Sequence, residues 1–242
     1  MRRYSQQTRM LLAVDCIVAG YDGQDLKLLV IQRSFEPFKG QWSLVGGFVE
    51  ENESAEDAAA RILKKLTGLD GLYMEQLHTF TAPGRDTVER TASVAFFTLI
   101  DIHRYKKQMS EDYHPAWFNL NEVPSLIFDH NEMVELAKQK LRYKAALHPL
   151  LFELLPAKFT LPQLQNLYEC LYNKKFDKGN FTRKVLSTKL LIKLKDKDKL
   201  SSKKGAYYYK VDPKKYSADF NAVLNFVSAP ALLNNRTKPK DK

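Results

Sequence analysis

The sequence predicts an α/β layered domain followed by a winged helix-turn-helix domain, and three observations support this prediction. Strand-like apolar runs recur through the first 150 residues, with one amphipathic helix between them. Two short amphipathic helices and an alternating hairpin follow. The net charge changes sign between the same two parts. We therefore expect a first domain over 1–150, a second over 151–216, and a partly disordered tail over 217–242.

The composition is that of a globular protein. The chain has 242 residues, of which 44% are hydrophobic, enough for two modest domains. No apolar run approaches the roughly 20 residues that a membrane span needs. Asp15 interrupts the first apolar segment too early for a signal peptide, so we expect a buried strand there. Cys16 and Cys170 lie too far apart for a disulfide framework, and we predict a cytoplasmic protein without membrane contact.

The charge is divided unevenly along the chain. Residues 1–150 contain 18 basic and 20 acidic residues, whereas 151–242 contain 20 basic and 8 acidic residues. The formal net charge of +10 therefore lies entirely in the second part. A solvated lysine-rich surface would explain this division, but so would a second domain that binds a polyanion.

The first part consists of five strand-like runs and one helix. The runs are rich in β-branched and aromatic residues and end at turns, and they are Leu11–Ala19, Leu26–Ile31, Leu72–Phe80, Thr91–Ile100 and Ala116–Leu120. The helix is expected from Ser54 to Leu66, with Ser54 as the N-cap, Asp57 at the capping-box position and Gly68 after the last turn.

Six residues around this helix fall at fixed spacings without a gap: Gly47, Glu53, Arg61, Leu63, Gly68 and Leu69. This arrangement resembles the Nudix box. The resemblance implies an α/β/α sandwich with a mixed sheet, in which Glu53 pairs with Arg61 and orients the box loop.

The carboxylates that a Nudix hydrolase uses to hold divalent metal ions are missing from this box. The resemblance places them at positions occupied here by Ile62, Lys65 and Leu66. Hard cations need several converging oxygen ligands, and an ammonium group would repel them. We therefore predict no catalytic residues, no metal site and no cofactor. The alternative is a Nudix hydrolase of ADP-ribose or a related nucleoside diphosphate that uses Glu50, Glu51 or Glu53.

A Nudix-type cleft without catalysis remains suited to sensing a small molecule. Arginine side chains can hold phosphates or hydroxyl groups, and aromatic rings can stack on a base or sugar. The candidate effector-binding residues are Arg33, Trp42, Phe48, Glu53, Arg61 and Arg85. Trp42 and Phe48 could instead be core residues. Arg90 is a further possible contact, which could instead belong to a surface ion pair.

The second part begins with a helix whose apolar face includes Met133 and Leu141, capped by Asp129 or Asn131. Pro149 and Pro156 bracket a predicted linker. The next helix is expected to start at Thr160, which forms a capping box with Gln163, and to continue through an apolar stripe.

A tight turn over 173–176 and a cap at Asp177 introduce a second helix, in which Phe181, Val185 and Leu186 are expected to face inward. A polar and basic stripe occupies its outer side, as recognition of base edges requires. The hairpin that follows, with strands over 190–195 and 206–211, is a candidate wing along phosphates. The candidate DNA-binding residues are Lys178, Asn180, Arg183, Lys184, Ser187, Lys203 and Lys204.

Four features of the chain together resemble the Nudix-related transcriptional regulators of the NrtR family, over about residues 8–216. They are the Nudix box without its metal-binding carboxylates, the run 155–168, Asn180 with Arg183, and Lys204 with Gly205. This resemblance implies a homodimeric repressor that binds a double-stranded DNA operator and releases it when a small molecule binds. That molecule is ADP-ribose or a related NAD metabolite in NrtR proteins. It is L-arabinose in the AraR-like, sugar-responsive branch of Bacteroidetes, which the segments 35–49 and 127–130 favour. A third hypothesis is a nucleic-acid binder without sequence specificity.

Overall fold

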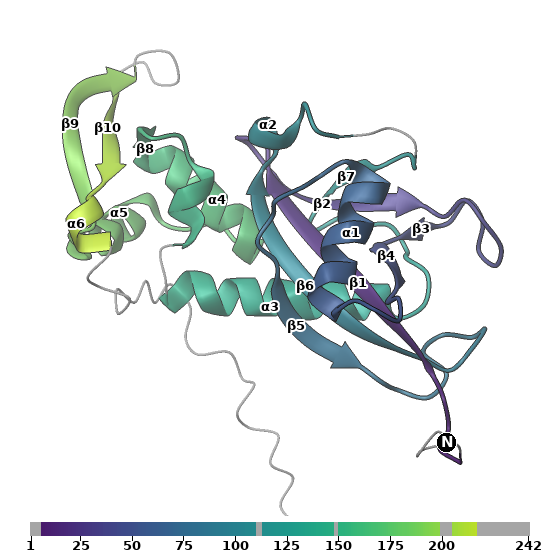
Figure 1. The fold of residues 1–242 in the computed structure, drawn as a ribbon. Helices are drawn as coiled ribbons and strands as arrows, with labels where there is room; N and C mark the ends of the chain where they lie inside the picture. Colours follow the sequence, from purple (N-terminus) through teal and green to yellow (C-terminus); the bar gives the residue numbers. More distant parts are fainter. Residues whose placement is uncertain (1–5, 110–112, 148–149, 199–204, 217–242) are drawn as a thin grey trace, which may run out of the picture.

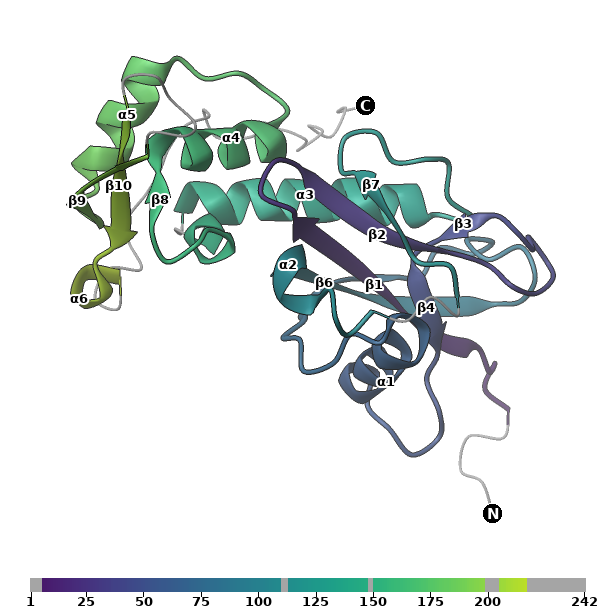
Figure 2. The same cartoon turned by 90° about the horizontal axis from the view of Figure 1, so that it is seen from above.

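A computed structural model describes residues 6–109, 113–147, 150–198 and 205–216. The first part is a mixed sheet between two helical layers (Figures 1 and 2). The strands of the sheet are β1 (Leu11–Tyr21), β2 (Leu26–Gln32), β3 (Trp42–Ser43), β4 (Val45–Phe48), β5 (Glu75–Phe80), β6 (Thr91–Asp101) and β7 (Ala116–Asn119). Strands β1 and β6 pair in parallel over their whole length, and the other pairs are antiparallel. The predicted α/β/α sandwich with a mixed sheet is confirmed.

Strand β1 separates the two cores of the sandwich because side chains alternate along a strand. Val14, Cys16 and Val18 pack against helix α1 (Ala55–Thr67) on one face. Ile17 and Ala19 pack on the other face against helix α3 (His130–Leu147). This two-sided burial explains why the run is almost continuously apolar.

The cap signals predicted from the sequence are present at three helices. Ser54 and Asp57 form the capping box of α1, and Gly68 ends that helix in the left-handed conformation. Thr160 and Gln163 form the same device at α4 (Leu161–Tyr172), and Asp177 caps α5 (Lys178–Ser187). These caps satisfy backbone amides that otherwise have no partner in the first turn.

The second part is a winged helix domain. Helices α4 and α5 are joined by a short turn, and the sheet order β8–β10–β9 forms the wing. The strands and short helices are α2 (Ile102–Tyr105), the 3-10 helix η1 (Leu150–Leu154), β8 (Phe159–Thr160), β9 (Leu191–Asp198), β10 (Ala206–Val211) and α6 (Pro213–Tyr216). Among the helices that the structure describes, none is long and apolar enough to cross a membrane.

Both parts share one hydrophobic core. The core under the α3 side of the sheet continues without a break through η1 into α4 and α5. Polar contacts follow the same route: Arg142 Nε of α3 donates to the carbonyl of Leu171 in α4 at 2.8 Å, and the Tyr172 hydroxyl donates to the carbonyl of Arg142 at 2.7 Å. Figure 2 shows α3 and α4 side by side.

Four details of the sequence prediction are wrong. The segment between Pro149 and Pro156 is no linker, because η1 buries Leu151, Phe152 and Leu154 in the shared core. The strand expected from Leu72 begins at Glu75, because Leu72 and Met74 pack under α1 instead.

The other two concern α3 and α5. Asp129 directly precedes α3, and its carbonyl accepts from the Met133 amide, but neither predicted side chain caps the helix. The Asp129 carboxylate binds Arg85, and the Asn131 amide oxygen accepts from the Leu126 backbone. Leu186 is exposed, whereas Leu190, which follows α5, is buried.

The shared core predicts coupled unfolding. Truncation of the fully buried Leu164 in α4 to alanine should lower the free energy of unfolding by about 2–5 kcal/mol. Both tryptophans, Trp42 and Trp117, lie in the first domain, so their fluorescence in a urea titration should report this loss although the change is in the second. The control is Leu186→Ala, which removes an exposed leucine. A tryptophan transition that does not move in Leu164→Ala would contradict a shared core.

Candidate functional site

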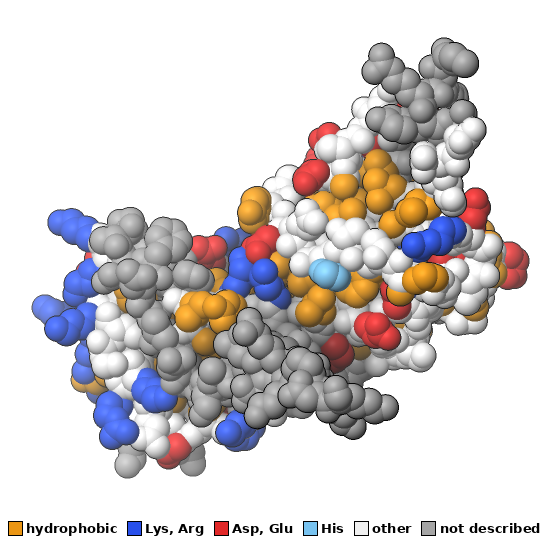
Figure 3. Space-filling model, turned by 90° about the horizontal axis from the view of Figure 1, so that it is seen from below, with side chains coloured by type: hydrophobic (Ala, Val, Ile, Leu, Met, Phe, Trp, Pro, Cys, Tyr) orange, Lys and Arg blue, Asp and Glu red, His pale blue; other side chains and the backbone are white. Residues whose placement is uncertain are grey.

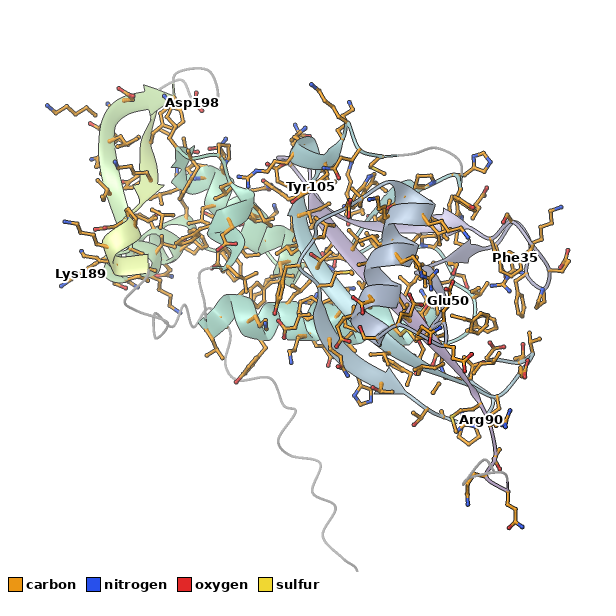
Figure 4. The ribbon with its side chains drawn as sticks, in the orientation of Figure 1. Phe35, Glu50, Arg90, Tyr105, Lys189 and Asp198 are labelled. Atoms are coloured by element: carbon orange, nitrogen blue, oxygen red, sulfur yellow. The ribbon has the colours of Figure 1, made fainter. Side chains whose placement is uncertain are left out.

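Two neighbouring cavities lie beside the box loop. The box cavity has a volume of about 340 Å³ and is bounded by α1 residues together with Arg33 and Glu50. The second cavity, of about 330 Å³, extends from the same loop to Asp15, Arg85 and His130. The two share Arg33, Phe35, Ser43, Gly46, Gly47 and Phe48. Figure 4 shows Phe35 and Glu50 at the end of the molecule away from Lys189 and Asp198, which mark the winged helix end.

Two glycines allow the box loop to lie close to its neighbours. A Cβ on Gly46 would lie 2.3 Å from Asp15 Oδ1, and a Cβ on Gly47 would lie 2.9 Å from Ile62 Cδ1. Neither position has room for a side chain without displacement. At Gly46 and Gly47, the wall that both cavities share therefore consists of backbone atoms without side chains.

The predicted Glu53–Arg61 pair holds the loop. Arg61 Nε donates to Glu53 Oε2 at 2.8 Å, its Nη2 donates to Glu53 Oε1, and Nη2 also donates to the Phe48 carbonyl at 3.1 Å. The hydrogen bonds from Arg61, and the one from the Glu50 backbone amide, lower the pKa of Glu53 to about 2. This prediction is confirmed, and it fixes Glu53 as a structural carboxylate that does not line either cavity.

The box helix does not present a donor set suited to divalent metal ions. Ile62, Lys65 and Leu66 line the box cavity where the metal-binding carboxylates of a Nudix hydrolase would be expected. Ile62 is almost fully buried under Gly47. Of the described acidic side chains, only Glu50 lines this cavity, and one carboxylate does not make a hard-cation site.

A charge cluster of Asp15, Arg85, Asp129 and His130 lies beside the second cavity, and all of its members except Asp129 line that cavity. Arg85 makes a two-point ion pair with Asp129, at 2.8 and 2.7 Å, and its Nη2 lies 3.8 Å from Asp15 Oδ2. The Ser93 hydroxyl donates to the same Asp15 oxygen at 2.6 Å. Because planar two-point pairs are geometrically specific, this cluster fixes the start of α3 against the sheet.

His130 is neutral in this environment. The Leu44 backbone amide donates to His130 Nδ1 at 3.2 Å, which places the ring proton on Nε2, 3.4 Å from Asp15 Oδ1. Burial lowers the pKa of His130 below its ordinary value of 6.5, although Asp15 and Asp129 act in the opposite direction. The feature of the sequence that could have indicated this cluster is Asp15, an acidic residue inside the apolar run of β1.

The structure brings four of the six candidate effector residues to the cavities. Arg33 and Phe48 line both, Arg61 lines the box cavity and Arg85 lines the second. Trp42 instead packs edge-on against Phe118, with 5.0 Å between ring centroids. Sequence reasoning missed Phe35, an exposed ring on which the Arg33 guanidinium stacks at 3.9 Å.

The outer face of α5 carries the candidate DNA-binding residues. Lys178, Asn180, Arg183, Lys184 and Ser187 are all exposed, while Phe181 and Val185 are buried beneath them. Arg183 Nη2 donates to Asn180 Oδ1 at 2.6 Å, which aligns the two side chains. Lys203 and Lys204 lie outside the described residues. Figure 3 shows Lys and Arg side chains gathered over the winged helix end.

Comparisons with known proteins agree with this division. A family model described as the NrtR DNA-binding winged helix domain matches residues 151–211, and a NUDIX domain model matches 10–138. The chain is 31% identical over 220 residues to the "ADPR responsive transcriptional repressor NtrR" of Acinetobacter baylyi, covering 89% of this chain and 88% of that protein. The chain belongs to the NrtR family.

Two further relatives extend this result. The crystal structure of Shewanella oneidensis NrtR with a 27mer DNA matches this NrtR-family chain with a TM-score of 0.69 and 33% identity, covering 85% of this chain and 95% of that one. An ADP-ribose pyrophosphatase of Methanocaldococcus jannaschii is 33% identical over 145 residues, or 60% of this chain and 80% of that enzyme. None of these names refers to L-arabinose or another free pentose, so the sugar-responsive branch stays a prediction.

The neutral, buried His130 predicts that this NrtR-family protein loses stability in acid. As the pH falls through the ordinary histidine pKa of 6.5, the unfolded chain takes up a proton at this histidine more readily than the folded chain, so the free energy of unfolding falls. His130→Gln should reduce this pH dependence in urea titrations, whereas replacement of the exposed His78 by glutamine should leave it as in the wild type. An equal pH dependence in both variants would contradict the assignment.

Proposed function

We propose that this protein is a transcriptional repressor that binds an operator through α5 and the wing and releases it when ADP-ribose binds at the box loop. The observation that carries the proposal is the combination of an exposed basic recognition face on α5 with a Nudix box that has lost its metal-binding carboxylates. The full-length similarity to a repressor named for its response to ADP-ribose supports this effector.

The chemistry of the cavities suits a nucleotide-like effector. Guanidinium groups of Arg33 and Arg61 and the ammonium of Lys65 line the box cavity, and the exposed rings of Phe35 and Phe48 stand at its border with the second cavity. Cations bind a diphosphate, and rings stack on a base. A ligand that spans both cavities would also contact the cluster around Arg85.

Helix α3 supplies a path from effector to DNA. It starts at the buried charge cluster, and its second half contacts α4 through Arg142. We propose that an effector in the second cavity changes the setting of α3, and that α4 and α5 move with it. Two copies of the chain, arranged with two-fold symmetry, would present two recognition helices to a pseudo-palindromic operator. Because a prokaryotic repressor acts on a chromosome that lies in the cytoplasm, we propose a cytoplasmic location, as its bacterial relatives suggest.

The recognition helix can be tested with a duplex that the wild-type protein selects from a random pool. Arg183→Ala should weaken binding to that duplex by about 1–3 kcal/mol, or roughly 5- to 150-fold, because an arginine that reads base edges cannot be replaced by alanine. Fluorescence anisotropy with the selected and a scrambled duplex measures this change. The control Lys64→Ala removes the same charge from α1, far from α5. Unchanged affinity of Arg183→Ala for the selected duplex would refute the assignment.

The effector can be tested with the same duplex. Saturating ADP-ribose should lower the affinity of the wild-type protein for it by about 5- to 150-fold, the usual range of coupling between two sites. L-arabinose and other pentoses, which the sequence resemblance also favours, are titrated in parallel. Release by L-arabinose and not by ADP-ribose would replace the proposed effector with the sugar.

The second candidate function is hydrolysis of ADP-ribose, which the similarity to the M. jannaschii enzyme supports. Glu50 lines the box cavity and Glu53 lies beside it, held by Arg61. Turnover of ADP-ribose with Mg²⁺ or Mn²⁺ that is abolished by Glu50→Gln would establish this activity. Absence of turnover with either metal ion would contradict this second function.

A further inference from the structure

The box helix presents a cation where a hydrolase of this fold would present a metal-binding carboxylate. Lys65 lies one helical turn after Arg61 on α1, is exposed, and lines the box cavity. Its neighbours on the cavity wall, Ile62 and Leu66, are apolar and offer no ligand atoms. The charge that a metal ion would bring to this place is therefore supplied, in part, by the chain itself.

The cations of the box cavity differ in how far they are already neutralised. Arg61 is bound to Glu53 and has Glu50 3.4 Å away, so its charge is largely balanced. Lys65 and Arg33 form no ion pair with any carboxylate of the described residues. Arg33 is held in place by its stacking on Phe35 and by its donation to the Phe35 carbonyl at 3.2 Å. Two cations that have no carboxylate within 4 Å among the described residues therefore line a cavity of about 340 Å³, although Asp86 and Glu36 act on Arg33 at longer range.

We infer that Lys65, together with Arg33, binds the diphosphate of the effector directly and makes its binding independent of divalent metal ions. This inference rests on the proposed function and specifies the chemistry of the same site. A diphosphate brings two or more negative charges, which in a Nudix hydrolase would be neutralised by the metal ions. Here an ammonium and a guanidinium face the place of those ions, and charge-assisted hydrogen bonds to phosphate are stronger than neutral ones.

The test measures binding to the full-length protein by calorimetry, in buffer that contains EDTA and again in buffer with Mg²⁺. The wild-type protein should bind ADP-ribose equally in both. Lys65→Ala should weaken binding by about 10- to 150-fold, the effect of losing a hydrogen bond to a charged group, and Lys65→Arg should restore most of it. Adenosine, which has no phosphate, should bind wild type and Lys65→Ala equally.

Lys64→Ala is the matched control. Lys64 is the preceding residue on α1, is equally basic and exposed, and pairs with Asp70 instead of lining either cavity. This variant should bind ADP-ribose as the wild type does. Thermal unfolding of both alanine variants checks that neither change disturbs the fold.

The outcomes separate this inference from the proposed function. Tight binding of ADP-ribose that Lys65→Ala leaves unchanged, or that requires Mg²⁺, overturns the inference and leaves the repressor proposal standing. Lys65-dependent binding of ADP or inorganic pyrophosphate, without binding of ADP-ribose, supports the inference and overturns the effector. If none of the three diphosphates binds in EDTA, the inference fails.

Discussion

Helix α3 packs against the mixed sheet along one side and against α4 along another, so that the cores of both domains are continuous through it. Its first turn is anchored by the Asp129–Arg85 pair, and its second half is tied to α4 by hydrogen bonds of Arg142. Packed contacts of this kind couple two distant sites only if the packed elements can adopt two alternative arrangements. The buried charges at one end of α3 are the groups through which, in our proposal, a charged ligand alters the setting of this helix.

The Nudix box has kept the residues that shape the fold and lost those that perform chemistry. Gly47 and the Glu53–Arg61 pair still fix the loop over α1, and their loss would disturb the backbone. Ile62, Lys65 and Leu66 all line the box cavity, and Ile62 and Leu66 also pack in the core beneath α1. In place of carboxylates, this surface carries apolar and basic residues, which suit the binding of an anionic ligand that we propose.

Local features were predictable from the sequence, and contacts between distant segments were not. The capping boxes at Ser54 and Thr160 depend on residues three positions apart, so their patterns sufficed. The resemblance to the Nudix box also implied that Glu53 pairs with Arg61. By contrast, Arg85 and Asp129 are 44 positions apart in the sequence, and only the folded structure shows that they form an ion pair. The segment before Pro156 was misread for the same reason, because its packing partners lie in α3 and α4.

The wing shows how aromatic residues prepare lysines for a polyanion. On the hairpin of β9 and β10, Lys193 Nζ lies 3.6 Å and Lys197 Nζ 4.4 Å from the centre of the Tyr207 ring. A free lysine carries about 2 kcal/mol of rotamer entropy, and attraction to the ring narrows the conformations of both side chains before any phosphate arrives. Part of the rotamer entropy of Lys193 and Lys197 has thus been lost during folding. Less of it therefore remains to be lost when DNA orders these two side chains.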